Sequence, residues 1–215
     1  IFSLHEIDLA LKSCDVAILV KEGRIVDCGS PEKVGSNEAI SALFDMDGAG
    51  FSAFMGTIEL SNRNKPSVFV VGGGGTATGI YRMLTKNNIG FYTGILHEND
   101  VDCHIAETIG VVAVKERPFK SIGPKAFARA KSLLRDISLV IDSGCPYGLA
   151  NRANQRLVLE ALQQGLPVCT LRREKEIQLL YREWAEKIIC CREPGEIVTH
   201  CIAGGENRKL KMING

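Results

Sequence analysis

An α/β fold is predicted for most of this chain of 215 residues. From residue 66 onward, short apolar runs alternate with segments of helical periodicity, and the first run ends in a turn of four glycines. Alternation of this kind is typical of a parallel sheet covered by helices on both faces. We therefore predict a Rossmann-like, doubly wound domain over residues 66–215, preceded by a smaller part with a different pattern.

The expected elements of this domain follow one another regularly along the chain. Strands are predicted at residues 68–71, 90–96, 111–114, 138–141, 167–171 and 188–191. Helices are predicted at residues 77–87, 102–109, 124–135, 151–164, 174–187 and 193–203. The apolar runs have the length of strands, and glycine, proline or polar residues mark most of the boundaries.

The composition limits the classes of function. An apolar content of 45% suffices for a substantial core, and the net charge of +1 gives no electrostatic reason to expect nucleic acid or an acidic membrane as a partner. No apolar stretch has the length of a membrane span. The eight cysteines include no C-x-x-C pair, which favours buried, reduced thiols in a reducing cytoplasm over a metal site.

The first 46 residues carry motifs of their own. The run Leu-His-Glu-Ile-Asp at 4–8 is followed by Gly-Arg-Ile-Val-Asp-Cys-Gly-Ser-Pro at 23–31. Between them, the pattern predicts a helix at 6–14 and a hairpin that turns at 21–23. In this order the motifs resemble the end of an ABC transporter ATPase. The resemblance implies that His5 is the switch histidine, which contacts the γ-phosphate of ATP and is the expected catalytic residue.

The same resemblance implies a larger protein and its partners. ATPases of this family need a Gly-x-x-x-x-Gly-Lys-Ser/Thr loop and a carboxylate for Mg²⁺, both upstream of the switch histidine. Because the chain starts at Ile1, we expect a fragment that does not hydrolyse ATP, and ATP with Mg²⁺ as the cofactor of the full-length protein only. The implied partners are the transmembrane permease subunits of an importer, which would hold the protein at the cytoplasmic, inner face of the cell membrane.

Residues 47–65 are predicted to be a linker. They begin with Asp-Gly-Ala-Gly and end in a polar run before Pro66. Three parts are therefore expected: an ATPase remnant at 1–46, the linker at 47–65, and a Rossmann-like ligand-binding or regulatory domain at 66–215. A remnant without its partners is expected to pack against the larger domain, to be disordered or to be exchanged between chains, and we expect a homodimer.

The glycine turn is the leading candidate for a ligand site. Doubly wound folds bind ligands at the carboxyl ends of the strands where the strand order reverses. Backbone N–H groups of such a turn, at the start of a helix, can approach a phosphate. The match to a P-loop fails, however, because Ile80 and Tyr81 replace Lys-Ser/Thr. The expected cofactor-binding residues of the turn are Gly72, Gly73, Gly74, Gly75 and Thr76.

Two further loops add candidate residues. Glu98 follows the second strand, where a dinucleotide fingerprint places an acid that bonds a ribose hydroxyl. The polar cluster around it leaves open a metal site, an oxyanion sensed through His97 and His104, or merely a capped polar turn without a ligand. A ligand crevice is expected between the glycine turn and the loop after the fourth strand. That loop contributes Asp142, Gly144, Asn151 and Asn154.

Cys145, in the same loop, is a further alternative. A helix start lowers the pKa of a thiol, which would suit a nucleophile. No histidine is placed in the sequence as its obvious base, so this role is disfavoured.

A second resemblance concerns residues 67–171. It rests on Gly-Ile-Leu-His-Glu-Asn-Asp at 94–100, Pro-Phe at 118–119 and Pro-Tyr-Gly-x-x-Asn-x-x-Asn at 146–154. These motifs resemble a carboxy-terminal extension of some prokaryotic ABC ATPases of the iron-chelate and cobalamin uptake type. The resemblance implies a cytoplasmic domain attached to an importer subunit.

Two functions follow as expectations. In the first, the chain belongs to the ATP-binding subunit of an importer, and residues 66–215 dimerise or sense an unknown small, nucleotide-like ligand. In the second, this domain is an independent NAD(P)- or nucleotide-dependent enzyme, a reductase or a transferase. The first is favoured because the sequence shows no evident acid–base pair or activated nucleophile.

Overall fold

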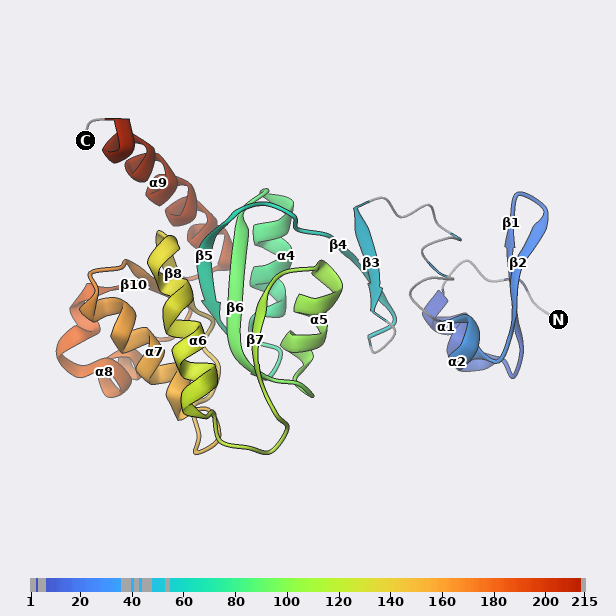
Figure 1. Ribbon diagram of the computed structural model, residues 1–215, viewed down its shortest axis with the longest axis horizontal. Helices are drawn as coiled ribbons and strands as arrows, with labels where there is room; N and C mark the ends of the chain where they lie inside the picture. Colours follow the sequence, from blue (N-terminus) through green and yellow to red (C-terminus); the bar gives the residue numbers. More distant parts are fainter. Residues whose placement is uncertain are drawn as a thin grey trace. The chain divides into compact units, whose positions relative to one another are not determined.

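The computed structural model describes residues 3, 7–35, 40, 43, 48–52 and 55–213 (Figure 1). The chain divides into two compact units, Ile1–Ser61 and Asn62–Gly215. The candidate catalytic residue His5 lies outside the described residues. Among the helices that the structure describes, none combines the length and the apolar character needed to span a membrane.

The first unit begins with a helix, a hairpin and a short helix, in the predicted order. The hairpin is antiparallel, and its turn contains Glu22 and Gly23 at φ 50° and 73°. Two successive residues with positive φ match the right-handed twist of a two-residue hairpin, which is the reason for glycine here. The elements are α1 (Ile7–Ser13), β1 (Ala17–Lys21), β2 (Arg24–Gly29) and α2 (Pro31–Val34).

The segment expected to be a linker contains a second hairpin. Strands β3 (Ala49–Ser52) and β4 (Thr57–Leu60) pair antiparallel, and Gly56 turns the chain between them at φ 67°. Phe51 is fully buried, which gives β3 an apolar anchor. Of the glycines that suggest a flexible connection, Gly48 and Gly56 have positive φ outside the strands, whereas Gly50 lies within β3 and pairs with Glu59.

The second unit contains a single sheet of six parallel strands within residues 62–213, as predicted. Its order is β10-β9-β8-β5-β6-β7, so the chain starts in the middle, builds outward in one direction and then in the other. This is the strand order 3-2-1-4-5-6 of the doubly wound fold. The strands are β5 (Pro66–Val71), β6 (Gly90–His97), β7 (Ala113–Glu116), β8 (Leu139–Asp142), β9 (Val168–Thr170) and β10 (Ile188–Cys190).

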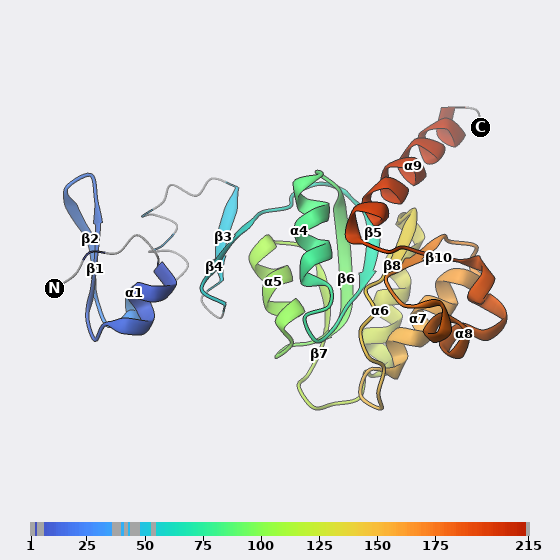
Figure 2. The same ribbon diagram turned by 180° about the vertical axis from the view of Figure 1, so that it is seen from behind.

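Helices cover both faces of this sheet, because alternate residues of the buried strands point to opposite sides. Val71 and Val140 pack with α6, α7 and α8 on the face seen in Figure 1. Val70 and Ile141 pack with α4, α5 and α9 on the face seen in Figure 2. The helices are α4 (Thr78–Lys86), α5 (Val101–Ile109), α6 (Pro124–Leu133), α7 (Arg152–Gln163), α8 (Glu174–Tyr181) and α9 (Pro194–Ile213).

Two helix ends differ from the prediction. The helix expected at 174–187 ends at Tyr181 and continues as the 3₁₀ helix η2 (Arg182–Lys187), since Arg182 adopts φ 47° and interrupts the α-helical path. The last helix extends to Ile213 instead of ending near 203. Gly204 and Gly205 are weak helix formers, but Arg, Lys, Leu and Met follow at 208–212 and no proline interrupts the segment, so the helix continues.

Substitutions at two glycines test how closely the backbone packs at the start of β6. A Cβ at Gly90 would collide with the backbone carbonyl oxygens of Asn64 and Lys65, so Gly90→Ala is expected to destabilise the second unit by about 1–3 kcal/mol. A Cβ at the exposed helical Gly79 meets nothing within 4 Å, so Gly79→Ala is expected to stabilise it by about 0.5–1 kcal/mol. Urea unfolding followed by the fluorescence of Trp184, the single tryptophan, measures both. Equal effects of the two substitutions would contradict the packing described.

Candidate functional site

Four loops at the carboxyl ends of the strands are joined to one another by hydrogen bonds. They follow β5 (72–77), β6 (98–100), β7 (117–123) and β8 (143–151), and we call them the loop ring. The strand order reverses between β5 and β8, so this edge is where doubly wound folds bind ligands. The loops that follow β7 and β8 lie next to each other at the lower edge of the sheet in Figure 1.

Each loop of the ring contacts the next. Gly74 N–H donates to Asp100 Oδ2 over 2.8 Å, which joins the first loop to the second. His97 Nε2–H, at the end of β6, donates to the carbonyl oxygen of Lys120 over 2.7 Å. Two further bonds close the ring: Ile122 N–H to Ala150 O, 2.9 Å, and Thr76 Oγ1 with Ser143 Oγ, 2.7 Å. The structure thus brings the glycine turn and the loop after β8 together.

The glycine turn is held by a buried carboxylate. Asp102 is fully buried, and its Oδ2 accepts hydrogen bonds from the N–H groups of Gly73 and Ala77, at 2.9 and 3.1 Å. Its Oδ1 accepts from Thr78 Oγ1 at 2.9 Å. Burial raises the pKa of Asp102, although these three donors act in the opposite direction. The carboxylate therefore occupies the position at which the start of α4 would receive an anion.

Asp100 holds the turn from the other side. Its Oδ1 accepts from the N–H of Asp102 at 2.9 Å, which caps the start of α5, while its Oδ2 accepts from Gly74. Together the two aspartates take up the N–H groups of Gly73, Gly74 and Ala77. The phosphate that the sequence predicts at this turn would meet two carboxylates instead of free donors, so the geometry disfavours a phosphate there.

The acid expected at the end of β6 does not contact the glycine turn. Glu98 is exposed, and its backbone N–H donates to the carbonyl oxygen of Glu116. The acid that contacts the glycine turn is instead Asp100, two residues further on. Within the described residues, the structure brings together no group of three His, Cys, Asp or Glu side chains able to hold a metal ion. The metal alternative for this cluster thus has no geometric support.

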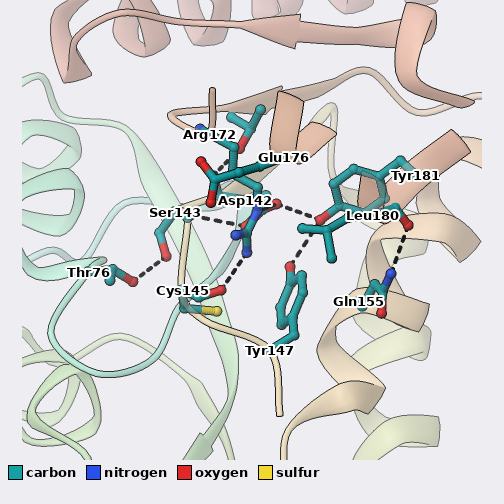
Figure 3. Close-up of polar contacts among 12 residues, drawn as sticks. Thr76, Asp142, Ser143, Cys145, Tyr147, Gln155, Arg172, Glu176, Leu180 and Tyr181 are labelled. Atoms are coloured by element: carbon teal, nitrogen blue, oxygen red, sulfur yellow. Dashed lines mark hydrogen bonds and ion pairs between the residues drawn. The ribbon is translucent and has the colours of Figure 1, made fainter. Parts of the chain in front are cut away.

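Asp142, at the end of β8, belongs to a buried ion pair (Figure 3). Its Oδ2 accepts from Arg172 Nε over 2.7 Å and from the Tyr181 hydroxyl over 2.5 Å, and its Oδ1 accepts from Arg172 Nη2 and from the N–H of Gly144. The two side chains expose no more than 3% of their surface. Burial acts to lower the pKa of Arg172, but the adjacent carboxylate outweighs it and raises that pKa.

The ion pair fixes the loop after β8. Arg172 Nη2 donates to the carbonyl oxygen of Cys145, and the guanidinium lies over the ring of Tyr147, 4.4 Å from its centre (Figure 3). The Tyr147 hydroxyl is 3.1 Å from that of Tyr181. Gly144 adopts φ 87°, a conformation that favours glycine and lets its N–H reach Asp142. Asp142 and Gly144 thus hold the loop after β8 in place, and the Asp142 carboxylate itself is buried.

The two asparagines have structural partners as well. Asn154 is buried, and its amide exchanges hydrogen bonds with the N–H and carbonyl groups of Ile95, at 2.8 and 3.0 Å. Ile95 lies at an irregularity of the β6–β7 pairing, so the amide replaces the missing strand partner. Asn151 accepts from Gly148 N–H and donates to the carbonyl oxygen of Pro146, which closes the loop before α7.

Cys145 does not have the environment of a nucleophile. Its side chain is fully buried, and burial together with the charge of Asp142 raises the pKa of the thiol to about 12. A thiol of this kind is largely protonated at neutral pH and inert.

The sequence indicated some of these residues and not others. The cluster at 97–104 drew attention to the right loop, and an Asp two residues before another Asp at a helix start is a cap signal that points to Asp100. Arg172 and Tyr181 gave no signal, because an arginine after an apolar strand and a tyrosine in a helix fit an ordinary surface and an ordinary core equally well.

Comparison with known proteins places the chain in a family. Residues 91–200, from β6 into α9, match the model of the MJ0874 family. The protein MJ0874 of Methanocaldococcus jannaschii is 37% identical over 67 residues, which are 31% of this chain and 72% of that protein. The chain belongs to the MJ0874 family.

Other relatives of this MJ0874-family chain are ATP-binding proteins of ABC transporters. The cobalamin import ATP-binding protein BtuD of Halobacterium salinarum is 28% identical over 197 residues, covering 88% of this chain and 47% of the relative. The ABC transporter ATP-binding protein MJ0873 of M. jannaschii is 36% identical over 99 residues, 45% of this chain and 34% of the relative. The chain thus spans less than half of the length of these relatives.

A solved structure has a similar chain path. The alignment with the molybdenum cofactor binding protein from Rippkaea orientalis includes 66% of this chain and 98% of that protein, with a TM-score of 0.47 and 16% sequence identity.

Removing the charge of Asp142 tests the buried ion pair of this MJ0874-family domain. Asp142→Asn leaves the Arg172 guanidinium buried without its counter-ion, so we expect a loss of about 3–5 kcal/mol in the free energy of unfolding. Glu160→Gln, which removes the partner of Lys131 in a more exposed pair, is expected to cost less than about 1 kcal/mol. Urea unfolding compares the two variants, and similar losses would contradict the structural role of Asp142.

Proposed function

We propose that this chain is part of the ATP-binding subunit of an ABC importer for a cobalamin-like or iron-chelate-like solute. The observation that carries the proposal is the match to the cobalamin import ATP-binding protein, which runs through 88% of the chain and so includes residues of both units. A single relative therefore combines a counterpart of the first unit with a counterpart of the second. Within such a subunit, ATP with Mg²⁺ is the cofactor and transmembrane permease subunits are the partners.

The location and assembly follow from the same proposal. A subunit bound to a permease acts on the cytoplasmic side, peripheral to the inner face of the membrane. His5 is its proposed switch histidine, on the strength of the motif alone. The homodimer expected from the sequence stays a prediction. Residues 1–46, the ATPase remnant, would belong to the ATPase domain of the full-length subunit.

Residues 62–215 are proposed to regulate that ATPase by binding a small ligand at the loop ring. The support is the position of the ring at the reversal of strand order, together with its bonds between all four loops. The aspartates Asp100 and Asp102 specify the ligand further. A nucleotide-like molecule that presents sugar hydroxyls to Asp100 gains hydrogen bonds, whereas one that presents a phosphate meets like charge.

The alternative is an independent NAD(P)- or nucleotide-dependent enzyme. One observation favours it, because the strand order is that of dinucleotide-binding domains. Two observations oppose it: carboxylates hold the N–H groups that would receive a pyrophosphate, and the buried Cys145 is no activated nucleophile. We therefore place the regulatory function first.

Calorimetric titration separates the two functions. For residues 1–215 we expect adenosine or a similar nucleoside to bind at least about tenfold more tightly than AMP, ATP or NADPH, because Asp100 and Asp102 repel the phosphates. Asp100→Asn is expected to reduce this preference, since the amide carries no charge. Glu98→Gln, at the exposed neighbouring position, serves as the matched control and is expected to leave it unchanged. Tighter binding of NADPH than of the nucleoside would favour the enzyme.

Deletion in the full-length subunit tests the regulatory role. Reconstituted with its permease, the full-length protein is expected to hydrolyse ATP, and removal of residues 62–215 is expected to preserve hydrolysis while abolishing its response to the nucleoside. The comparison is made at equal transporter concentration in the same vesicles. ATPase activity that disappears with residues 62–215 would instead show that they complete the ATPase fold.

A further inference from the structure

One face of the second unit carries an unusual charge distribution. Residues 117–135 and 143–159 include eight Lys or Arg residues and no Asp or Glu, although the whole chain has a net charge of only +1. These segments form the loops after β7 and β8 together with α6 and most of α7, which pack side by side (Figure 1). All eight basic side chains are exposed, although Lys131 pairs with Glu160 of α7 at 2.6 Å: Arg117, Lys120, Lys125, Arg129, Lys131, Arg135, Arg152 and Arg156.

Two apolar side chains project from the same loops. Phe119 is 93% exposed and Leu149 is 88% exposed, the largest values among the large hydrophobic residues that the structure describes. The hydrogen bond from Ile122 to Ala150 fixes their two loops to each other. Phe119 also has φ 60°, a left-handed conformation that is rare for a bulky residue. Flanked by Arg117 and Lys120, it forms with Leu149 a pair that we call the apolar tips.

The residues around the apolar tips indicate which kind of partner this surface would bind. A second copy of the chain would need an extended apolar surface, whereas two isolated side chains on loop ends provide too little area for a stable dimer. A nucleic acid would use the basic residues and can stack a base on Phe119, but it has no use for the exposed aliphatic side chain of Leu149. An anionic bilayer uses both features, since its interface accommodates single apolar side chains and its headgroups attract Lys and Arg.

We propose that the basic face and the apolar tips form a docking surface for an anionic phospholipid membrane. Phe119 and Leu149 enter the headgroup region, while Lys120 and Arg152, at the base of the two loops, contact lipid phosphates. This contact requires no permease. It makes the membrane a direct partner of the second unit.

Co-sedimentation of residues 1–215 with vesicles tests the proposal. We expect binding to phosphatidylcholine vesicles that contain about one third phosphatidylglycerol, weak binding to phosphatidylcholine alone, and release by added salt. Lys120→Ala combined with Arg152→Ala is expected to weaken binding about thirtyfold, given roughly fivefold for each charge near the surface. Lys86→Ala combined with Lys175→Ala removes two exposed charges outside the basic face and is the matched control, expected to change binding less than about twofold.

The apolar tips are tested separately from the charge. Phe119→Ser combined with Leu149→Ser keeps the net charge and is expected to weaken binding to the anionic vesicles about tenfold or more. Leu179→Ser, at a residue of α8 that is 78% exposed, is the control and should bind like the unmodified chain. Circular dichroism and the fluorescence of Trp184 verify that each variant is folded.

Four outcomes would overturn the membrane proposal. Equal binding to neutral and anionic vesicles would remove the role of charge. Unchanged binding of the tip variant would remove the role of Phe119 and Leu149, and tight binding to a short RNA that the tip variant retains would assign the face to nucleic acid. A dimer in light scattering that dissociates in the tip variant would assign the tips to a second copy.

Discussion

The buried carboxylate of Asp102 is the constraint on which the candidate site depends. It accepts three hydrogen bonds from the glycine turn and the first turn of α4, and so does within the chain what a ligand phosphate does in many doubly wound folds. Removing water from a carboxylate is costly, and only several donors with good geometry offset that cost. The glycine turn is therefore preorganised without a ligand. The groups that the carboxylates at this edge can still bind are hydroxyl donors or cations.

A second buried carboxylate has the corresponding role on the other half of the sheet. Asp142 connects the end of β8 to Arg172 after β9 and to Tyr181 at the end of α8, so the strand ends and the helix are fixed as one body. Such a pair contributes little net stability compared with apolar packing, but it specifies one arrangement because any other leaves a charge unpaired. The bond between Thr76 and Ser143 then joins the two halves across the reversal of strand order.

Periodicity predicted the parallel sheet well, because each buried strand, such as β5 or β8, is a continuous apolar run that ends at a glycine or a polar residue. The sequence also indicated three of the four loops that hydrogen bonds join, those after β5, β6 and β8. It could not identify what their polar residues do, since these roles depend on partners distant in the sequence. Asp142 forms an ion pair with Arg172, thirty positions further along, and Asn154 forms hydrogen bonds with the backbone of Ile95, 59 positions earlier. The hairpin β3–β4 was missed because glycines dominate a short segment in which, among the residues that the structure describes, Phe51 is the one fully buried apolar side chain.

These contacts separate two surfaces of the same edge. The inner surface, at the glycine turn, carries Asp100 and Asp102, which disfavour a phosphate. The outer surface, on α6, α7 and the loops before them, is basic and presents Phe119 and Leu149. Charges of opposite sign on adjacent surfaces orient a molecule in an electric field, and an anionic membrane would attract the outer surface. Because Phe119 and Leu149 belong to loops of the ring, the proposed membrane contact and the candidate ligand site share one edge of the sheet.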